Sequence, residues 1–203
     1  MEILISKFNN ENVENSIQEM EKRYNFVFPE EYRMFLKKYN GGKTPDTTFH
    51  LQGISSDIQA FYGLAKADMS YNISMIENTP LFFNMVNNNL FPIAINSFGD
   101  DVLIGLRGDN AGKIYFCYHD TSKGNIELSP SLSVFLSCCR SQKIGHIRTI
   151  EERIADMKRM GKGNKVTEVK LKCWQEEIDE YSQIKQEKVT LGYGGLKTGK
   201  YRR

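Results

Sequence analysis

Residues Phe28–Gly42, FPEEYRMFLKKYNGG, contain a helix with a start signal, a buried stripe and an end signal. Pro29 suits the first helical position, because its missing N–H would have no intrahelical partner there. The apolar side chains at i, i+3, i+4 and i+7 are Tyr32, Phe35, Leu36 and Tyr39. This spacing predicts one buried helix face. Asn40-Gly41-Gly42 favours the left-handed backbone that ends helices, so we expect the helix to stop there.

Helix and strand patterns alternate around this segment. Apolar residues at helical spacing predict an amphipathic helix over Glu11–Tyr24. The runs Phe49–Ile54 and Ile58–Leu64 are short and flanked by Gly, Ser and Asp, which is typical of strands. Residues Ala67–Thr79 are interpreted as a further helix. The chain therefore starts with two helices and continues into strands.

The stretch Leu90–Asp120 carries the clearest strand signal. Apolar residues alternate along 102–106 and again along 114–118, and Asp109-Asn110-Ala111-Gly112 between them is typical of a tight turn. This pattern predicts an antiparallel hairpin. Ser129-Pro130 then resembles a helix start, with an apolar stripe up to Cys139.

The charges divide the chain in two. Its 203 residues have a net charge of +2, but residues 1–139 hold 11 Lys+Arg against 16 Asp+Glu, and residues 140–203 hold 16 against 9. The net charges are therefore −5 and +7. We expect a domain over 1–140 and a basic extension over 141–203, with two short helices and then a mobile Gly/Lys-rich tail.

Neither a membrane nor a metal is indicated by the sequence. The longest apolar runs are too short to span a bilayer, and MEILISKFNN lacks the features of a signal peptide, so a cytoplasmic location is expected. The four cysteines show no paired ligand spacing and are expected to be reduced and mostly buried. The sequence predicts no metal and no cofactor.

Several motifs occur together in a fixed order. They are Phe28-Pro29-x-x-Tyr32-x-x-Phe35-Leu36, Asn40-Gly41-Gly42, Phe61-Tyr62-Gly63-Leu64, Pro92-Ile93-Ala94, Gly99-Asp100, Gly112-Lys113-Ile114-Tyr115, His119-Asp120 and Ser133-x-Phe135-Leu136. In this order the motifs resemble those of the SUKH superfamily over about residues 10–140. Two positions depart from that pattern: Asn96-Ser97-Phe98-Gly99, where Gly-rich sequence is commoner, and Phe116-Cys117-Tyr118, which lacks a tryptophan frequent there.

The resemblance implies an α+β fold with a mixed or antiparallel sheet flanked by helices, and no known catalytic activity. The superfamily includes a fungal regulator of cell-wall synthesis and many bacterial immunity proteins, which bind and neutralise toxin domains that are often nucleases. The resemblance thus implies a cognate toxin domain as partner. An acidic domain facing a basic toxin is consistent with the charge of residues 1–139.

Candidate partner-binding residues cluster around two motifs. Gly99, Asp100 and Asp101 form one motif, and Tyr118, His119 and Asp120 form the other; Asp109 and Tyr62 complete the candidates. The alternative for the aspartates is turn stabilisation, because Asp accepts hydrogen bonds from its own backbone neighbours. The alternative for the tyrosines is core packing.

Two other functions compete with the immunity hypothesis. A regulatory adaptor would hold a protein through its core and bind nucleic acid or an acidic surface through residues 141–203. An enzyme has the least support, since no Ser-His-Asp order or isolated acid pair appears in the chain. No residue is therefore predicted to be catalytic.

Overall fold

The computed structural model describes residues 2–120 and 124–191. Within these ranges the fold combines antiparallel strands with helices, as the resemblance implies. The strands are β1 (Leu4–Lys7), β2 (Gly42–Leu51), β3 (Ile54–Phe61), β4 (Leu90–Ile95), β5 (Asp101–Gly105), β6 (Ile114–Cys117), β7 (Ile126–Ser129), β8 (Arg140–Ser141) and β9 (Glu187–Lys188). The α-helices are α1 (Val13–Arg23), α2 (Glu30–Tyr39), α3 (Pro80–Asn87), α4 (Leu132–Cys138), α5 (Ile150–Arg159) and α6 (Glu168–Gln183).

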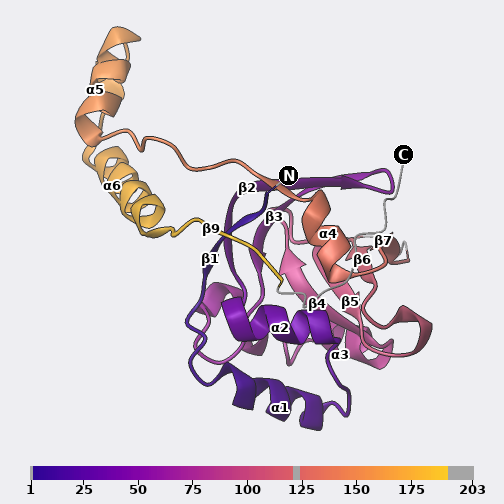
Figure 1. The fold of residues 1–203 in the computed structure, drawn as a ribbon. Helices are drawn as coiled ribbons and strands as arrows, with labels where there is room; N and C mark the ends of the chain where they lie inside the picture. The colour runs from indigo at the N-terminus through magenta and orange to yellow at the C-terminus, as the bar shows by residue number, and fades with distance from the viewer. Residues whose placement is uncertain (1, 121–123, 192–203) are drawn as a thin grey trace.

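One sheet organises the domain. Its strand order is β7-β6-β5-β4-β3-β2-β1-β9, with β8 also paired to β2. Every pair of these named strands is antiparallel. In Figure 1, α2 and α4 lie in front of the sheet and α1 lies below α2. The main core fills the space between these helices and the sheet, and a smaller cluster around Leu103 and Tyr115 includes Met85 from α3.

Helix α2 buries the face that its spacing predicts. Tyr32, Phe35, Leu36 and Tyr39 are all exposed by 1% or less. Several aromatic rings of this core pack edge-to-face, an arrangement that favours the ring quadrupoles; Phe28 and Tyr32, for example, have centroids 5.2 Å apart. Pro29 is the N-cap and not the first helical residue as expected, since its ψ of 141° is extended.

The end of α2 is tied to β3. Asn40 has a left-handed φ of 52° and is fully buried. Its side-chain amide donates to the carbonyls of Asn9 (2.7 Å) and Leu64 (2.8 Å), and its side-chain oxygen accepts from the Leu64 N–H (2.9 Å). A Cβ on Gly41 would lie 2.5 Å from the Phe61 carbonyl oxygen, so glycine is required at this close approach.

The helix predicted over Ala67–Thr79 is wrong. This segment forms two 3₁₀ turns, η1 (Met69–Tyr71) and η2 (Ile73–Met75), and the α-helix α3 begins only at Pro80. Asp68 and Asn72 cap the two turns by accepting hydrogen bonds from Ser70 N and Ser74 N. Such side chains offer the backbone an alternative to the α-helix, which explains the error.

Some element boundaries also differ from expectation. Strand β2 begins at Gly42, earlier than predicted, and tolerates Pro45 because the pairing with β3 is irregular between Lys43 and Thr47. Helix α4 begins at Leu132 with Ser131 as its cap, and not at Ser129-Pro130. The predicted hairpin is confirmed as β5–β6, which pair in antiparallel register.

The extension leaves the domain and returns to it. Helices α5 and α6 project away from the sheet, and the chain then comes back as β9 (Figure 1). β9 pairs with β1, with Leu4 opposite Lys188, and Thr190 N donates to the Tyr39 hydroxyl (2.8 Å). The tail predicted to be mobile falls almost wholly in 192–203, outside the described residues.

Two further expectations meet the structure here. Of the four cysteines only Cys139 is buried; Cys117 and Cys138 are half-buried and Cys173 is exposed. The expectation that most of the cysteines are buried is therefore wrong. Among the described helices, none has both the length and the apolar character needed to cross a membrane.

Candidate functional site

The β5–β6 hairpin brings most candidate residues to one end of the sheet. Asp100 and Asp101 lie at the start of β5, and His119 and Asp120 follow the end of β6. Because the two strands are antiparallel, the start of one adjoins the end of the other: Asp101 is opposite Cys117. The structure therefore joins two motifs that are separated by the whole hairpin in the sequence.

Asn96 organises the turn between β4 and β5. Its side-chain oxygen accepts hydrogen bonds from Phe98 N (2.9 Å) and Asp100 N (2.8 Å). Its amide group donates to Ser56 Oγ (3.0 Å) and Asp100 Oδ2 (2.9 Å). A buried amide with these four bonds fixes the turn in one conformation.

Asp100 links this turn to the segment after β6. Its Oδ1 accepts from His119 N (3.0 Å) and lies 2.8 Å from His119 Nδ1. Burial opposes the ionised carboxylate, but the hydrogen bonds from His119 and Asn96 outweigh it and lower the pKa of Asp100. The same Asp100 hydrogen bond raises the pKa of His119, so the protonated imidazolium is favoured.

Asp101 has the opposite electrostatic environment. Its side chain is buried, and its Oδ1 accepts a hydrogen bond from the Tyr62 hydroxyl (3.0 Å). Burial raises the pKa of Asp101 to about 7, although the Tyr62 hydrogen bond works against this shift. Burial also raises the pKa of Tyr62. This pair is part of the interior and offers little surface to a partner.

Phe98 is the exposed feature of the turn. Its side chain is 75% exposed, the largest exposure among the large apolar residues of the described chain. The preceding residue is held to β3, because Asp57 accepts from both Ser97 N and Ser97 Oγ (3.1 Å each). An aromatic ring is thus presented to solvent on a turn that is fixed from two sides.

Sequence reasoning did not select Asn96, Phe98 or Asp57. The signal was present, because Asn96-Ser97-Phe98-Gly99 is one of the two departures from the family pattern. Gly99 has a φ of 90°, and a Cβ placed on it would be 3.9 Å from the His119 ring. The departure therefore lies directly against the His119 segment.

Two of the predicted residues lie elsewhere or inside. Asp109 is in the 3₁₀ turn η3 (Gly108–Asn110) between β5 and β6, at the opposite end of the hairpin from Asp100. Tyr118 is half-buried and packs edge-to-face on Phe116, with ring centroids 4.9 Å apart. The structure therefore groups Gly99, Asp100, Asp101, His119, Asp120 and Tyr62, and separates Asp109 from them.

One group in the described part of the chain has metal-ligand spacing. Ligand atoms of Asp100, His119 and Asp120 lie within 4.8 Å of one another. Asp100 and the His119 ring are already hydrogen-bonded to each other, and Asp100 also accepts from Asn96. These bonds account for Asp100 as a turn-fixing group, and we assign no metal or cofactor here.

The fold and this site define an α+β domain with a single antiparallel sheet and a rigid turn at one of its ends. The sequence profile of the SMI1/KNR4 family (SUKH-1) matches residues 13–138. The chain therefore belongs to the SMI1/KNR4 family (SUKH-1), which is generally non-enzymatic and fits a domain of the immunity or regulator kind. Among curated proteins, no significant match was found.

Proposed function

We propose that this chain is a non-enzymatic immunity protein that binds and neutralises a cognate toxin domain. The observation that carries the proposal is the hydrogen-bonded β4–β5 turn, which presents Phe98 to solvent next to Gly99, the residue that approaches the His119 ring. Aromatic residues on fixed backbone are favoured at the centre of interfaces, because little conformational freedom is lost on binding.

The chemistry around Phe98 indicates the charge of the partner. Asp57 is half-buried at the turn, and Asp120 is exposed on the other side of His119. Acidic groups around an apolar centre complement a basic surface and speed association with it. A nuclease domain is one such partner, since its active site must attract phosphate.

Asp100 and Asp101 contribute to this surface indirectly. They are exposed by only 7% and 8%, and both are hydrogen-bonded. We therefore place them as positioning residues that hold the turn and the His119 segment. Reversing their charge would disturb the fold, so a test of partner binding needs exposed residues.

The first step is to examine the gene next to the one for this chain; where it encodes a large toxin, the experiment uses the full chain and the C-terminal domain of that toxin. Co-expression is expected to protect cells from that domain, and titration calorimetry is expected to show one-to-one binding. Phe98→Ala should raise the dissociation constant about thirtyfold, which corresponds to roughly 2 kcal/mol for a central aromatic residue. Asp120→Lys should slow association.

Matched controls come from the other end of the domain. Val27 is also an exposed apolar residue (67%), and Asp109 is an exposed acid at the far end of the hairpin. Val27→Ala and Asp109→Lys should leave binding unchanged. Equal losses in the Phe98 and Val27 variants would place the interface elsewhere, and absence of protection by the wild-type chain would reject the proposed function.

The adaptor hypothesis requires the extension to be a basic ligand-binding segment. Residues 141–191 hold 11 Lys+Arg and 9 Asp+Glu, so this described part has a net charge of only +2. Residues 192–203 hold four Lys+Arg and no acid. The described extension as a whole is therefore close to balanced, and a basic segment for the adaptor would have to be residues 158–172 or 192–203.

A further inference from the structure

The arm, residues 146–183, touches the domain near the end of α6, where Lys43 Nζ lies 3.2 Å from Glu180 Oε1. Figure 1 shows α5 and α6 standing away from the sheet. Both helices are described in full, and neither contains a buried residue. Yet both carry apolar side chains at helical spacing, such as Ile154 and Met157 in α5 and Leu171 and Trp174 in α6. A helix pair with an apolar stripe that is only half covered is incomplete as a folding unit.

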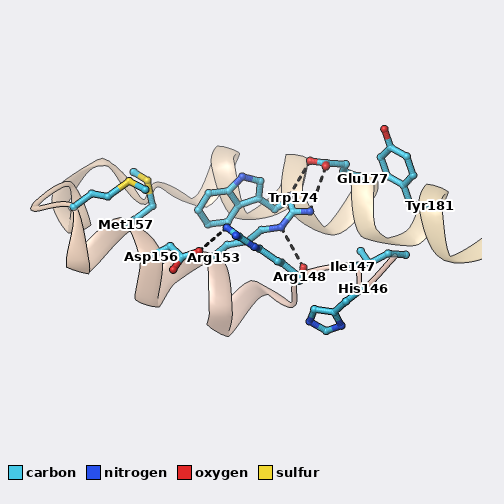
Figure 2. Close-up of a pocket in the computed structure, with 10 residues that line it drawn as sticks. His146, Ile147, Arg148, Arg153, Asp156, Met157, Trp174, Glu177 and Tyr181 are labelled. Atoms are coloured by element: carbon cyan, nitrogen blue, oxygen red, sulfur yellow. Dashed lines mark hydrogen bonds and ion pairs between the residues drawn. The ribbon is translucent and has the colours of Figure 1, made fainter. Parts of the chain in front are cut away.

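A groove runs along one side of the arm. It has a volume of about 530 Å³, and its apolar lining consists of Ile147, Met157, Met160, Trp174 and Tyr181. Figure 2 shows the Trp174 ring against Arg153, whose guanidinium is held by Glu177 (2.8 and 3.2 Å) and by the Arg148 carbonyl (3.2 Å). The floor of the groove is therefore ordered by ion pairing, while Met160 (65%) and Tyr181 (43%) remain exposed.

The charges of the arm are separated along its length. Residues 158–172, the tip, carry six Lys or Arg and the single acid Glu168. Residues 173–183, the acidic half of α6, carry four acids and no Lys or Arg; these acids are Glu176, Glu177, Asp179 and Glu180. The arm is thus positive at its far end and negative where α6 approaches the domain.

This charge order is unfavourable for α6 by itself. The helix dipole favours acids in the first turn and bases in the last turn. Helices α1, α2 and α5 follow this rule at both ends, whereas α6 follows it only at its start, with Glu168; its last turn has no basic residue, and its other four acids lie in its second half. Within the chain, Arg153 pairs with Glu177 and Lys43 pairs with Glu180. A partner that supplies positive charge beside Glu176 and Asp179 would add to this compensation.

We propose that the groove face of the arm binds the arm of a second copy of this chain, with the two arms antiparallel around a two-fold axis. In that arrangement each basic tip lies beside the acidic half of the other α6, and the same contact occurs twice. A parallel arrangement would instead oppose like charges. The two grooves cover each other, which removes their apolar lining from water.

Trp174 reports directly on this interface. It is the second residue of the acidic half, next to the tip, so an antiparallel pairing places it near the two-fold axis. It is also the only tryptophan of the chain. Association should therefore shift its fluorescence to shorter wavelength and protect it from a soluble quencher.

The first experiment follows the full-length chain through a dilution series by sedimentation velocity and tryptophan fluorescence. The expected result is a reversible monomer–dimer equilibrium, with the fluorescence shift tracking the dimer fraction. Added salt should weaken the dimer because it screens exposed charges. A chain that remains monomeric throughout the series overturns the proposal.

The second experiment reverses the charges of each half. The tip variant is Lys162→Glu with Lys165→Glu, and the acidic-half variant is Glu176→Lys with Asp179→Lys. Each should raise the dimer dissociation constant roughly tenfold or more, because attractive pairs become repulsive at two symmetric contacts. Mixing the two variants should restore association as a heterodimer, which also shows that both are folded.

A control variant changes the same charge elsewhere. Lys22→Glu with Lys66→Glu alters two exposed lysines of the domain and should leave the dimer unchanged. If the arm variants left the dimer dissociation constant unchanged, or if the two variants did not associate on mixing, the antiparallel arrangement would be rejected. A monomeric chain whose tip variant alone loses binding to a single-stranded oligonucleotide would make the arm a nucleic-acid site instead.

Discussion

Helices α2 and α6 have the same kind of sequence pattern but differ in how much of their apolar face is buried. Both carry large apolar side chains at helical spacing, but four residues of α2 are exposed by 1% or less, whereas no residue of α6 is buried. α2 packs between a sheet and two other helices, while α6 packs along α5 and reaches the domain at its C-terminal end, where Glu180 pairs with Lys43 (3.2 Å). Periodicity thus predicts a helix with an apolar face, and the number of layers around it decides how much of that face is buried.

This difference in burial suggests that the domain determines stability and the arm determines association. The domain should contribute most of the free energy of unfolding, because it buries the aromatic core. The arm should contribute little to it and should be free to bind another surface. Four predictions test this division, and they follow in order of decreasing effect.

The largest effect is expected for Phe35→Ala in α2. Phe35 is fully buried and packs against Phe61 and Tyr39, so its removal leaves a cavity. The loss should be about 3–5 kcal/mol. Trp174→Ala in the arm should cost less than about 1 kcal/mol in the domain transition, since the ring is not buried. Urea unfolding followed by far-UV circular dichroism measures both.

The outcome decides whether domain and arm are separate units. Comparable losses in the two variants would mean that the arm unfolds together with the domain. Hydrogen exchange gives an independent check, because amides of α5 and α6 should exchange faster than those of α2.

The second prediction concerns the joint between α2 and the sheet. Asn40→Ala removes three hydrogen bonds and leaves the buried N–H of Leu64 without its partner. The expected loss is roughly 2–4 kcal/mol in urea unfolding. Asn25 is the matched control, because it shares the φ of 52° but is exposed.

Asn25→Ala places an alanine in the same left-handed backbone conformation as Asn40→Ala does, but it removes no buried hydrogen bonds. Its cost should be about 1 kcal/mol, the strain of a left-handed alanine. If the two variants lost the same amount, backbone conformation and not the side-chain network would account for the role of Asn40.

The third prediction is a pH dependence with a defined sign. Asp101 keeps its proton in the folded state up to a pKa of about 7, against 3.8 for an ordinary carboxyl. Between these values the folded state binds more protons than the unfolded state, so this contribution to stability is lost as pH rises through that window. Asp101→Asn carries no titratable proton and should be spared this loss.

Asp100→Asn should show the opposite sign. The pKa of Asp100 is lowered in the folded state, so its contribution is present above the ordinary value and is lost as pH falls through the folded one. Unfolding by urea measures both variants, above pH 4 for Asp101 and below pH 4 for Asp100. Parallel pH profiles for the wild type and Asp101→Asn would contradict the assignment.

The smallest effects come from two tyrosines on the same helix. The Tyr32 hydroxyl is buried and has no hydrogen-bond partner among the described residues, so Tyr32→Phe should stabilise the domain by about 1 kcal/mol. The Tyr39 hydroxyl accepts from Thr190 N on the returning segment, so Tyr39→Phe should destabilise it by about 1 kcal/mol. Thermal unfolding separates the two directions; a loss in both would show that the Tyr32 hydroxyl is satisfied.

The candidate site was predictable in its motifs but not in its roles. Gly99-Asp100 and His119-Asp120 were selected from the sequence, and antiparallel pairing brings them together. Their burial could not be inferred, because the local sequence of a turn is the same whether the aspartate carboxylate faces water or a buried amide. Asn96 and Phe98 were missed for the same reason: only the folded turn distinguishes its organiser from its exposed tip.

Local chemistry explains the failure over Ala67–Thr79. Apolar residues there have some helical character, yet Asp68 and Asn72 bind the backbone two residues onward and Thr79-Pro80 supplies a stronger start. The return of the chain as β9 had no local signal, since a two-residue strand is defined by its partner β1.

The sequence by itself determined the family, the α2 helix, the β5–β6 hairpin and the division of charge, because these depend on residue type and short-range spacing. Tertiary structure alone decided which polar groups are buried, which end of the sheet presents Phe98, and that the arm is left half covered. Those properties depend on contacts between distant segments, which residue spacing along the chain does not encode.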